Sequence, residues 1–227
     1  MVESCWDHTP DALLRRGWAS VSQQSAAQAA MIVRSLGTPV LDPRTGAEYS
    51  ELLPYRKDSA PRGSMSSLIG TGEQPMHTDA AYVPLPPRYV VLHCLERGES
   101  DCPTNIWTTD DLGLRDEKRP LLTTPVWLFG NGVGPAFYSP VIEMIGPFLR
   151  VRFDPCCMRP ASFSRHTIAD ARRALCDYAQ QIAIEWQTGD LLVIDNWRCL
   201  HARGVGCDRS PSRRLRRWCI GVQNGMG

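Results

Sequence analysis

Two histidines and one aspartate have the types and the spacing in this chain that best suit metal chemistry. His77 and Asp79 form an H-x-D pair, and His201 comes much later, after Gly-Asp-Leu-Leu-Val-Ile-Asp-Asn at 189–196. Residues i and i+2 of a strand project to the same face, so a strand or its end would let His77 and Asp79 bind one ion. Two imidazoles and one carboxylate are the ligands of a mononuclear iron(II) site with three adjacent open positions. The three residues therefore predict an oxygen-activating metal site, provided that they meet in space.

The sequence around these residues resembles the iron(II)/2-oxoglutarate-dependent dioxygenases of the taurine dioxygenase and clavaminate synthase type. Two stretches carry the resemblance: the H-x-D pair with Pro-Pro-Arg-Tyr at 86–89 and Cys94, and 189–196 with His-Ala-Arg at 201–203. An H-x-D pair alone is weak evidence, but the combination with the second stretch and a late arginine is specific. The resemblance implies that His77, Asp79 and His201 hold Fe(II), with 2-oxoglutarate as cosubstrate and O2 as oxidant.

The arginines near the C-terminus are candidates for holding the cosubstrate. A 2-oxo diacid needs a cation for its distal carboxylate, and arginine offers a bidentate fork. On a strand, Arg213 and Arg217 would share one face. The family has two arginines four residues apart, which implies that Arg213 holds 2-oxoglutarate and that Arg217 holds a substrate anion. Thr104 has a spacing like that of the family's threonine, but Asp-Cys-Pro at 101–103 replaces the usual Gly-rich lead-in, which leaves its role open.

The reaction that the resemblance implies is oxidative decarboxylation of 2-oxoglutarate to succinate and carbon dioxide, coupled to oxidation of an unactivated C–H bond. Hydroxylation is the expected outcome, and desaturation, ring closure and epoxidation are alternatives. Halogenation is not expected, because a halide needs the position that Asp79 fills. The substrate is expected to be a small molecule, anionic or amino-acid-like. A protein of a different class, a cupin-like metal-binding protein without oxygenase activity, is the alternative.

The hydrophobic pattern predicts a mainly β protein with flanking helices, a double-stranded β-helix (jelly roll) formed by a single domain over residues 1–227. Asn131-Gly132 is a hairpin-type turn signal between two of the expected strands. Thr167 and Asp170 resemble a capping box that opens the longest expected helix. The expected strands are 18–21, 89–94, 125–129, 136–144, 148–153, 190–194 and 215–222, and the expected helices are 9–17, 24–36 and 167–186. No motif identifies a role for residues 108–165.

Composition and charge narrow the class of partner. The net charge of the 227 residues is +1, so no global field attracts nucleic acid or acidic lipid. The arginine cluster at 209–217 lacks interleaved aromatic residues, and we expect no nucleic-acid binding. No apolar stretch approaches the roughly 20 residues that cross a bilayer, so no membrane association is expected. The oligomeric state is left open.

Two further features concern the cellular setting and a loop. The nine cysteines are an odd number without a C-x-x-C spacing, and no signal peptide is visible, which together indicate a reducing cytoplasm. Residues 54–76 are rich in Ser, Gly and Pro and immediately precede His77. Such a stretch is either a disordered loop or a mobile lid over the site.

Overall fold

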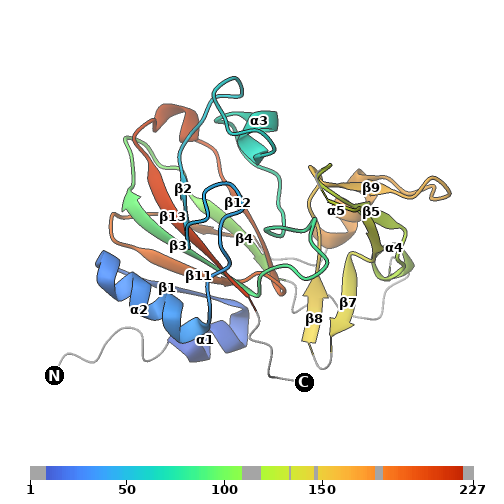
Figure 1. Ribbon diagram of the computed structural model, residues 1–227, viewed down its shortest axis with the longest axis horizontal. Coiled ribbons are helices and arrows are strands. Elements are labelled where there is room, and N and C mark those ends of the chain that lie inside the picture. Colours follow the sequence, from blue (N-terminus) through green and yellow to red (C-terminus); the bar gives the residue numbers. More distant parts are fainter. Residues whose placement is uncertain (1–8, 109–118, 133, 146–147, 177–180, 222–227) are drawn as a thin grey trace.

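Two antiparallel β-sheets face each other in the computed structural model, which describes residues 9–108, 119–132, 134–145, 148–176 and 181–221 (Figure 1). The larger sheet has the order β1 (Trp18–Val21), β11 (Leu191–Asp195), β3 (Tyr89–Glu96), β13 (Arg214–Ile220) and β2 (Ser50–Leu52). The smaller sheet has the order β10 (Gln181–Ile184), β4 (Thr104–Thr108) and β12 (Cys199–Arg203). The expected mainly β jelly-roll fold is confirmed.

The side chains between the two sheets form one apolar cluster. Leu92 and Leu215 of the larger sheet meet Ile106 of the smaller sheet and Trp186, which follows β10. Because successive residues of a strand point to opposite faces, neighbours such as Trp107 point away from this interior. The interior positions near one end of the cluster are polar instead, and they build the site described below.

Two helices cover the outer face of the larger sheet (Figure 1). They are α1 (Thr9–Arg16) and α2 (Ala26–Leu36). Ser25 caps α2 through a reciprocal capping box with Gln28. Ile32 and Val33 of α2 bury their side chains in a cluster with Trp218 of β13. The helix expected from the sequence at 24–36 is therefore present and forms part of this outer layer.

A third unit, which we call the outer lobe (described residues 119–176), covers the other side of the molecule (Figure 1). Its apolar core includes Leu200 and is lined by Trp107, so the lobe packs on the outer face of the smaller sheet. Its strands are β5 (Trp127–Phe129), β6 (Phe137–Ser139), β7 (Ile142–Ile145), β8 (Phe148–Val151) and β9 (Met158–Pro160), and its helices are α4 (Arg119–Thr123) and α5 (Ile168–Cys176).

The turn and capping signals of the lobe predict its structure well. β5 pairs with β6 in antiparallel register across the Asn131-Gly132 region, as the hairpin signal predicts. Thr167 and Asp170 form the expected capping box, with N–H···O distances of 2.9 and 3.2 Å. The expected strand over 136–144 is interrupted at Pro140 and forms β6 and β7.

The expected helix over 167–186 is wrong in its second half. Helix α5 ends at Cys176, and residues 181–184 form strand β10 instead. Ile182 lies opposite Ile106 of β4, so its backbone completes the smaller sheet. Apolar residues at 182 and 186 fit the period of a helix and also that of a strand, and tertiary pairing decides between them. Tyr178 lies outside the described residues.

The segment before His77 contains the short helix α3 (Met65–Ile69), which Ser64 caps. Arg203 of β12 donates hydrogen bonds to the carbonyls of Gly70 and Gly72, at 2.5 and 2.7 Å, and so holds the chain that follows α3 against the smaller sheet. Movement of 54–76 as a lid stays a prediction. The single 3-10 helix among the described residues is Cys207–Arg209. None of the described helices is long and apolar enough to cross a membrane.

Candidate metal centre

His77, Asp79 and His201 lie together at the polar end of the sandwich. The Nε2 atoms of both histidines are 3.7 Å from the Asp79 carboxylate, one from each oxygen. One ligand atom from each residue lies within 4.8 Å of the other two, and all three residues are buried. The backbones of His77 and His201 bond to each other in both directions at 3.0 Å, an isolated bridge that brings the two motifs together.

The H-x-D pair presents both ligands on one side without belonging to a regular strand. His77 forms the isolated bridge, and the chain turns after Asp79 through Ala80, which has a φ of 55°. Thr78 points the other way, where its hydroxyl donates to the carbonyl of Val151 and accepts the N–H of Phe153, both at 3.2 Å. The i, i+2 geometry that the sequence predicts is therefore present at an extended, bridged residue pair.

Asn196 holds the backbone on both sides of the Asp79 side chain. Its amide oxygen accepts the N–H of Asp79 at 2.9 Å, and its amide nitrogen donates to the carbonyl of Asp79 at 3.1 Å. The same nitrogen donates to the carbonyl of Pro87 at 2.9 Å. Asn196 is fully buried, so these bonds are not shared with water. One asparagine thereby orients the carboxylate from outside the ligand set.

A second link joins the two motifs through Arg88 and Asp195. Arg88 donates to both carboxylate oxygens of Asp195, with the shortest distance 2.9 Å. The indole N–H of Trp197 bonds to the carbonyl of Pro86 at 3.1 Å. Arg198 donates to the carbonyl of Leu14 at 2.7 Å, at the end of α1. Thus Trp197 and Arg198 pack the turn.

The hydrogen bonds and charges around the two histidines set the protonation of each imidazole. The carbonyl of Pro75 lies 3.0 Å from Nδ1 of His77, so a proton on Nδ1 leaves Nε2 free as a ligand. Burial opposes a charge on His77, but Asp79 raises its pKa above the usual value. Burial and the neighbouring His77 lower the pKa of His201 to about 3, which keeps this imidazole in the neutral form that binds metals.

Arg217 pairs directly with the ligand carboxylate. Its Nη1 donates to both oxygens of Asp79 at 3.0 and 3.2 Å, and its Nε donates to the hydroxyl of Ser50 at 3.3 Å. Burial favours the neutral acid, but the Arg217 charge and the two imidazoles hold the pKa of Asp79 well below its usual value. Asp79 is therefore ionised and can bind a metal cation while it is hydrogen-bonded to Arg217.

Arg213 is a buried cation whose guanidinium has no partner among the described residues. It directly precedes β13, it is 4% exposed, and its charge acts on Cys94, Cys102 and Cys207. The guanidinium makes no hydrogen bond or ion pair with any described residue, and its Nε is a buried donor without an acceptor. Gly98 has a φ of +84°, and a Cβ there would lie 3.0 Å from Arg213 Cβ, so the chain packs closely around this arginine. A buried unpaired charge is costly, which indicates an anionic ligand.

Thr104 lies at the same end of the sandwich. Arg203 is its partner across β12 and β4, and His201 is two residues along β12. The charge of Arg213 acts to lower the pKa of Cys102, two residues before Thr104, and that of Cys207. The pKa of the Cys207 thiol is lowered to about 6, chiefly by a hydrogen bond from Cys102 and also by the charges of Arg203 and Arg213. Burial acts in the opposite direction but is outweighed. Thr104 itself accepts the indole N–H of Trp186 at 3.0 Å.

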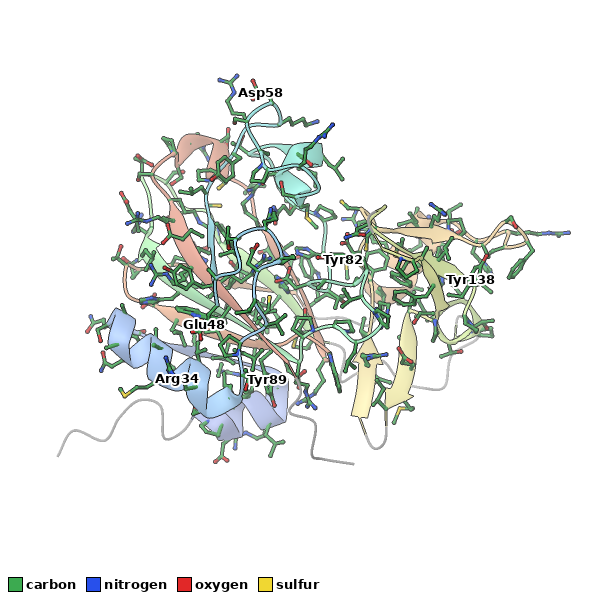
Figure 2. All side chains as sticks on the ribbon, viewed as in Figure 1. Arg34, Glu48, Asp58, Tyr82, Tyr89 and Tyr138 are labelled. Atoms are coloured by element: carbon green, nitrogen blue, oxygen red, sulfur yellow. The ribbon has the colours of Figure 1, made fainter. Side chains whose placement is uncertain are left out.

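Four further polar residues lie outside the ligand triad. His93 is buried in β3 with its Nε2 2.8 Å from the carbonyl of Gln24, so it is a hydrogen-bonded core histidine. Arg56 and Arg62 are exposed. Tyr82 lies between the sandwich and the outer lobe (Figure 2), where burial and the Asp79 charge raise the pKa of its phenol. The sequence does not predict the roles of Asn196 and Trp186, because no local pattern pairs them with Asp79 and Thr104.

The donor set fits iron(II) together with a 2-oxo diacid. Two imidazoles and a carboxylate suit a divalent first-row metal and leave coordination positions for other ligands. Register places Thr104 two strand residues from the level of His201, about 7 Å at the rise of a strand. This separation is comparable to the length of a five-carbon diacid.

Known proteins are similar to parts of this chain. Residues 115–219 match the family described as taurine catabolism dioxygenase TauD, TfdA family. The chain is 26% identical over 195 residues to the L-lysine 3-hydroxylase of Catenulispora acidiphila, covering 74% of this chain and 51% of that protein. The chain thus spans about half the length of this curated relative.

Solved structures share the fold over most of the chain. An asparagine oxygenase in complex with Fe(II), 2S,3S-3-hydroxyasparagine and succinate superposes with a TM-score of 0.70 at 17% identity, covering 90% of this chain and 74% of that chain. The non-heme iron oxygenase OrfP in complex with Fe and alpha-ketoglutaric acid gives a TM-score of 0.67 at 19% identity, covering 92% and 76%. The fold is shared with these proteins, although the sequences have diverged.

Proposed function

We propose that this chain is an oxygenase of the iron(II)/2-oxoglutarate-dependent superfamily that includes the taurine dioxygenases. It uses Fe(II), 2-oxoglutarate and O2 to hydroxylate a C–H bond of a free amino acid or a similar small molecule. The observation that carries the proposal is the combination of the His77, Asp79 and His201 triad with the unpaired buried Arg213 in one sandwich interior.

Different residues bind the metal and the cosubstrate. His77, Asp79 and His201 hold the iron, and Arg213 binds the distal carboxylate of 2-oxoglutarate with Thr104 beside it. When bound, iron(II) with this cosubstrate supplies oxygen activation: 2-oxoglutarate becomes succinate and carbon dioxide, and one oxygen atom enters a C–H bond. The residues around the triad are buried, and this limits the access of bulk water to the reacting groups.

Arg217 is the proposed contact for an anionic group of the substrate. Its Nη2 has no hydrogen-bond partner among the described residues, while Nη1 and Nε are bound to Asp79 and Ser50. A substrate carboxylate on this free edge would lie next to the metal ligands. The curated relative is named a lysine hydroxylase, and the two similar solved oxygenases were crystallised with an amino acid product or with the cosubstrate. An amino acid substrate is consistent with both observations.

The test is a screen of the twenty amino acids with Fe(II), 2-oxoglutarate and O2, followed by succinate and product mass. We expect one or a few amino acids to raise succinate release and to gain one oxygen atom. Chloride in the assay should yield no chlorinated product, because Asp79 fills the position that a halide needs. A protein that binds metal but releases no succinate with or without any candidate substrate is the cupin-like alternative.

The cellular setting is part of the same proposal. A small molecule is the partner, nucleic acid is not, and the location is the cytoplasm. The support for the location is the cysteine pattern, because no disulfide joins any two of the eight described cysteines. Filter binding of RNA and DNA at two salt concentrations tests the exclusion, because an arginine-driven complex would weaken strongly with salt.

A further inference from the structure

Trp186 and Thr104 form a buried hydrogen-bonded pair next to the proposed cosubstrate site. Trp186 is 5% exposed and Thr104 is 3% exposed. Trp186 follows β10, whose last residue, Ile184, lies opposite Thr104 in β4. The indole N–H therefore reaches across the sheet end to the Thr104 hydroxyl at 3.0 Å.

The hydrogen-bonding chemistry of the indole and the hydroxyl determines where the hydroxyl proton of Thr104 can point. An indole nitrogen only donates, whereas a hydroxyl has one proton and two lone pairs. Since Oγ1 of Thr104 accepts from Trp186, its own proton is left to donate elsewhere. No described residue accepts this proton. A buried donor without an acceptor in the protein is free to donate to a water or to a bound ligand.

Arg213 presents the same deficit on the facing sheet. Its guanidinium is buried and has no acceptor among the described residues. Two donors without acceptors at one end of the sandwich match the two oxygens of a single carboxylate. The charge of one carboxylate would also neutralise Arg213.

We propose that Trp186 is a positioning residue for 2-oxoglutarate, because its indole N–H turns the Thr104 hydroxyl proton toward the distal carboxylate held by Arg213. The inference rests on the proposed function, since the ligand is the cosubstrate of that reaction. Trp186 touches neither the metal nor the reacting atoms. It acts through Thr104 alone, and this makes its effect conditional on the Thr104 hydroxyl.

A double-mutant cycle tests this conditional effect. The Kd of 2-oxoglutarate is measured anaerobically on the Fe(II) protein by its charge-transfer absorption, and by calorimetry on the Zn(II) protein, for wild type, Trp186→Phe, Thr104→Val and the double variant. We expect Trp186→Phe to raise the Kd roughly three- to tenfold, the size of one oriented hydrogen bond. In the Thr104→Val background, Trp186→Phe should have no further effect on the Kd.

Trp127→Phe is the matched control. Trp127 is also buried and donates its indole N–H, to the carbonyl of Leu121 at 3.1 Å, but it lies in the outer lobe. It should lose a similar amount of thermal stability and leave the Kd of 2-oxoglutarate unchanged. If Trp186→Phe does not fold, Trp186→Met replaces it in the cycle as an adaptable apolar filler without a donor.

The outcomes separate the inference from the proposed function. If wild type with Fe(II) does not bind 2-oxoglutarate, the proposed function fails. If wild type binds it and Trp186→Phe has the same Kd, only the role of Trp186 is wrong. Additive effects of the two substitutions, or an equal loss in Trp127→Phe, would mean that Trp186 acts through packing and not through the Thr104 hydroxyl.

Discussion

Two buried arginines, one in the sandwich and one in the outer lobe, have opposite surroundings. Arg152 is 1% exposed, and its guanidinium donates to the carbonyls of Ala81, Val83 and Pro84 at 2.6 to 2.7 Å. Arg213 is also buried, but its guanidinium donates to no described residue. The Nη atoms of Arg152 have hydrogen-bond acceptors within the protein, whereas the guanidinium of Arg213 is left to bind a ligand. Burial alone therefore does not identify a functional arginine; missing partners do.

The largest expected effect follows the removal of the unpaired arginine. Arg213→Gln should raise the Kd of 2-oxoglutarate about a hundredfold or more, because a buried charge-assisted contact is worth roughly 2–5 kcal/mol. The melting temperature should stay the same or rise, because no protein partner is lost and a buried charge is removed. Anaerobic titration and thermal unfolding measure the two quantities.

The neighbouring Arg216 provides the control for that change. Arg216 lies on the other face of β13 and pairs with Glu51 at 3.0 Å. Arg216→Gln should leave the Kd of 2-oxoglutarate unchanged. A stability loss in Arg213→Gln without a change in this Kd would mean that the two buried arginines do not differ in the way described.

Substitution of the satisfied arginine should have the reverse profile. Arg152→Met removes the donor of three carbonyls, those of the buried Ala81 and of the more accessible Val83 and Pro84, so we expect a loss of about 3 kcal/mol in the free energy of unfolding. The Kd of 2-oxoglutarate should change far less than in Arg213→Gln. Urea unfolding followed by circular dichroism gives the first value. An unfolding free energy equal to that of wild type would contradict the structural role of Arg152.

A smaller effect is expected at the asparagine that orients the ligand carboxylate. Asn196→Ala removes all three hydrogen bonds that fix Asp79 and Pro87, without removing a metal ligand. We expect metal affinity to fall about 10- to 100-fold, the usual cost of losing such a support. Competition with a chelating dye measures it. Unchanged affinity in a folded variant would show that the local chain holds Asp79 by itself.

The sequence predicts the ligand set because residue type carries the chemistry directly. His77, Asp79 and His201 are identified by type and spacing, and the structure brings them together. Alternation along β13 is also readable: Leu215 lies between the sheets, whereas Trp218 packs under the helices. These features depend on the two-residue period of a strand, which any extended segment has.

Contacts between distant segments could not be predicted in the same way. Asn196 and Asp79 are 117 residues apart, and Trp186 and Thr104 are 82 apart. Nothing in either local sequence specifies these pairs, because they depend on how the sheets are stacked. The same limit explains the error at Ile182, whose strand exists only through its pairing with β4.

The most direct test of the central claim is anaerobic addition of 2-oxoglutarate to the Fe(II)-loaded protein, observed by visible absorption. We predict a weak charge-transfer band that saturates with one 2-oxoglutarate per iron and is absent in His77→Ala. Arg213→Gln should show the band only at much higher 2-oxoglutarate concentration. A wild-type protein that takes up no iron, or that takes it up and shows no band at any 2-oxoglutarate concentration, would contradict the account.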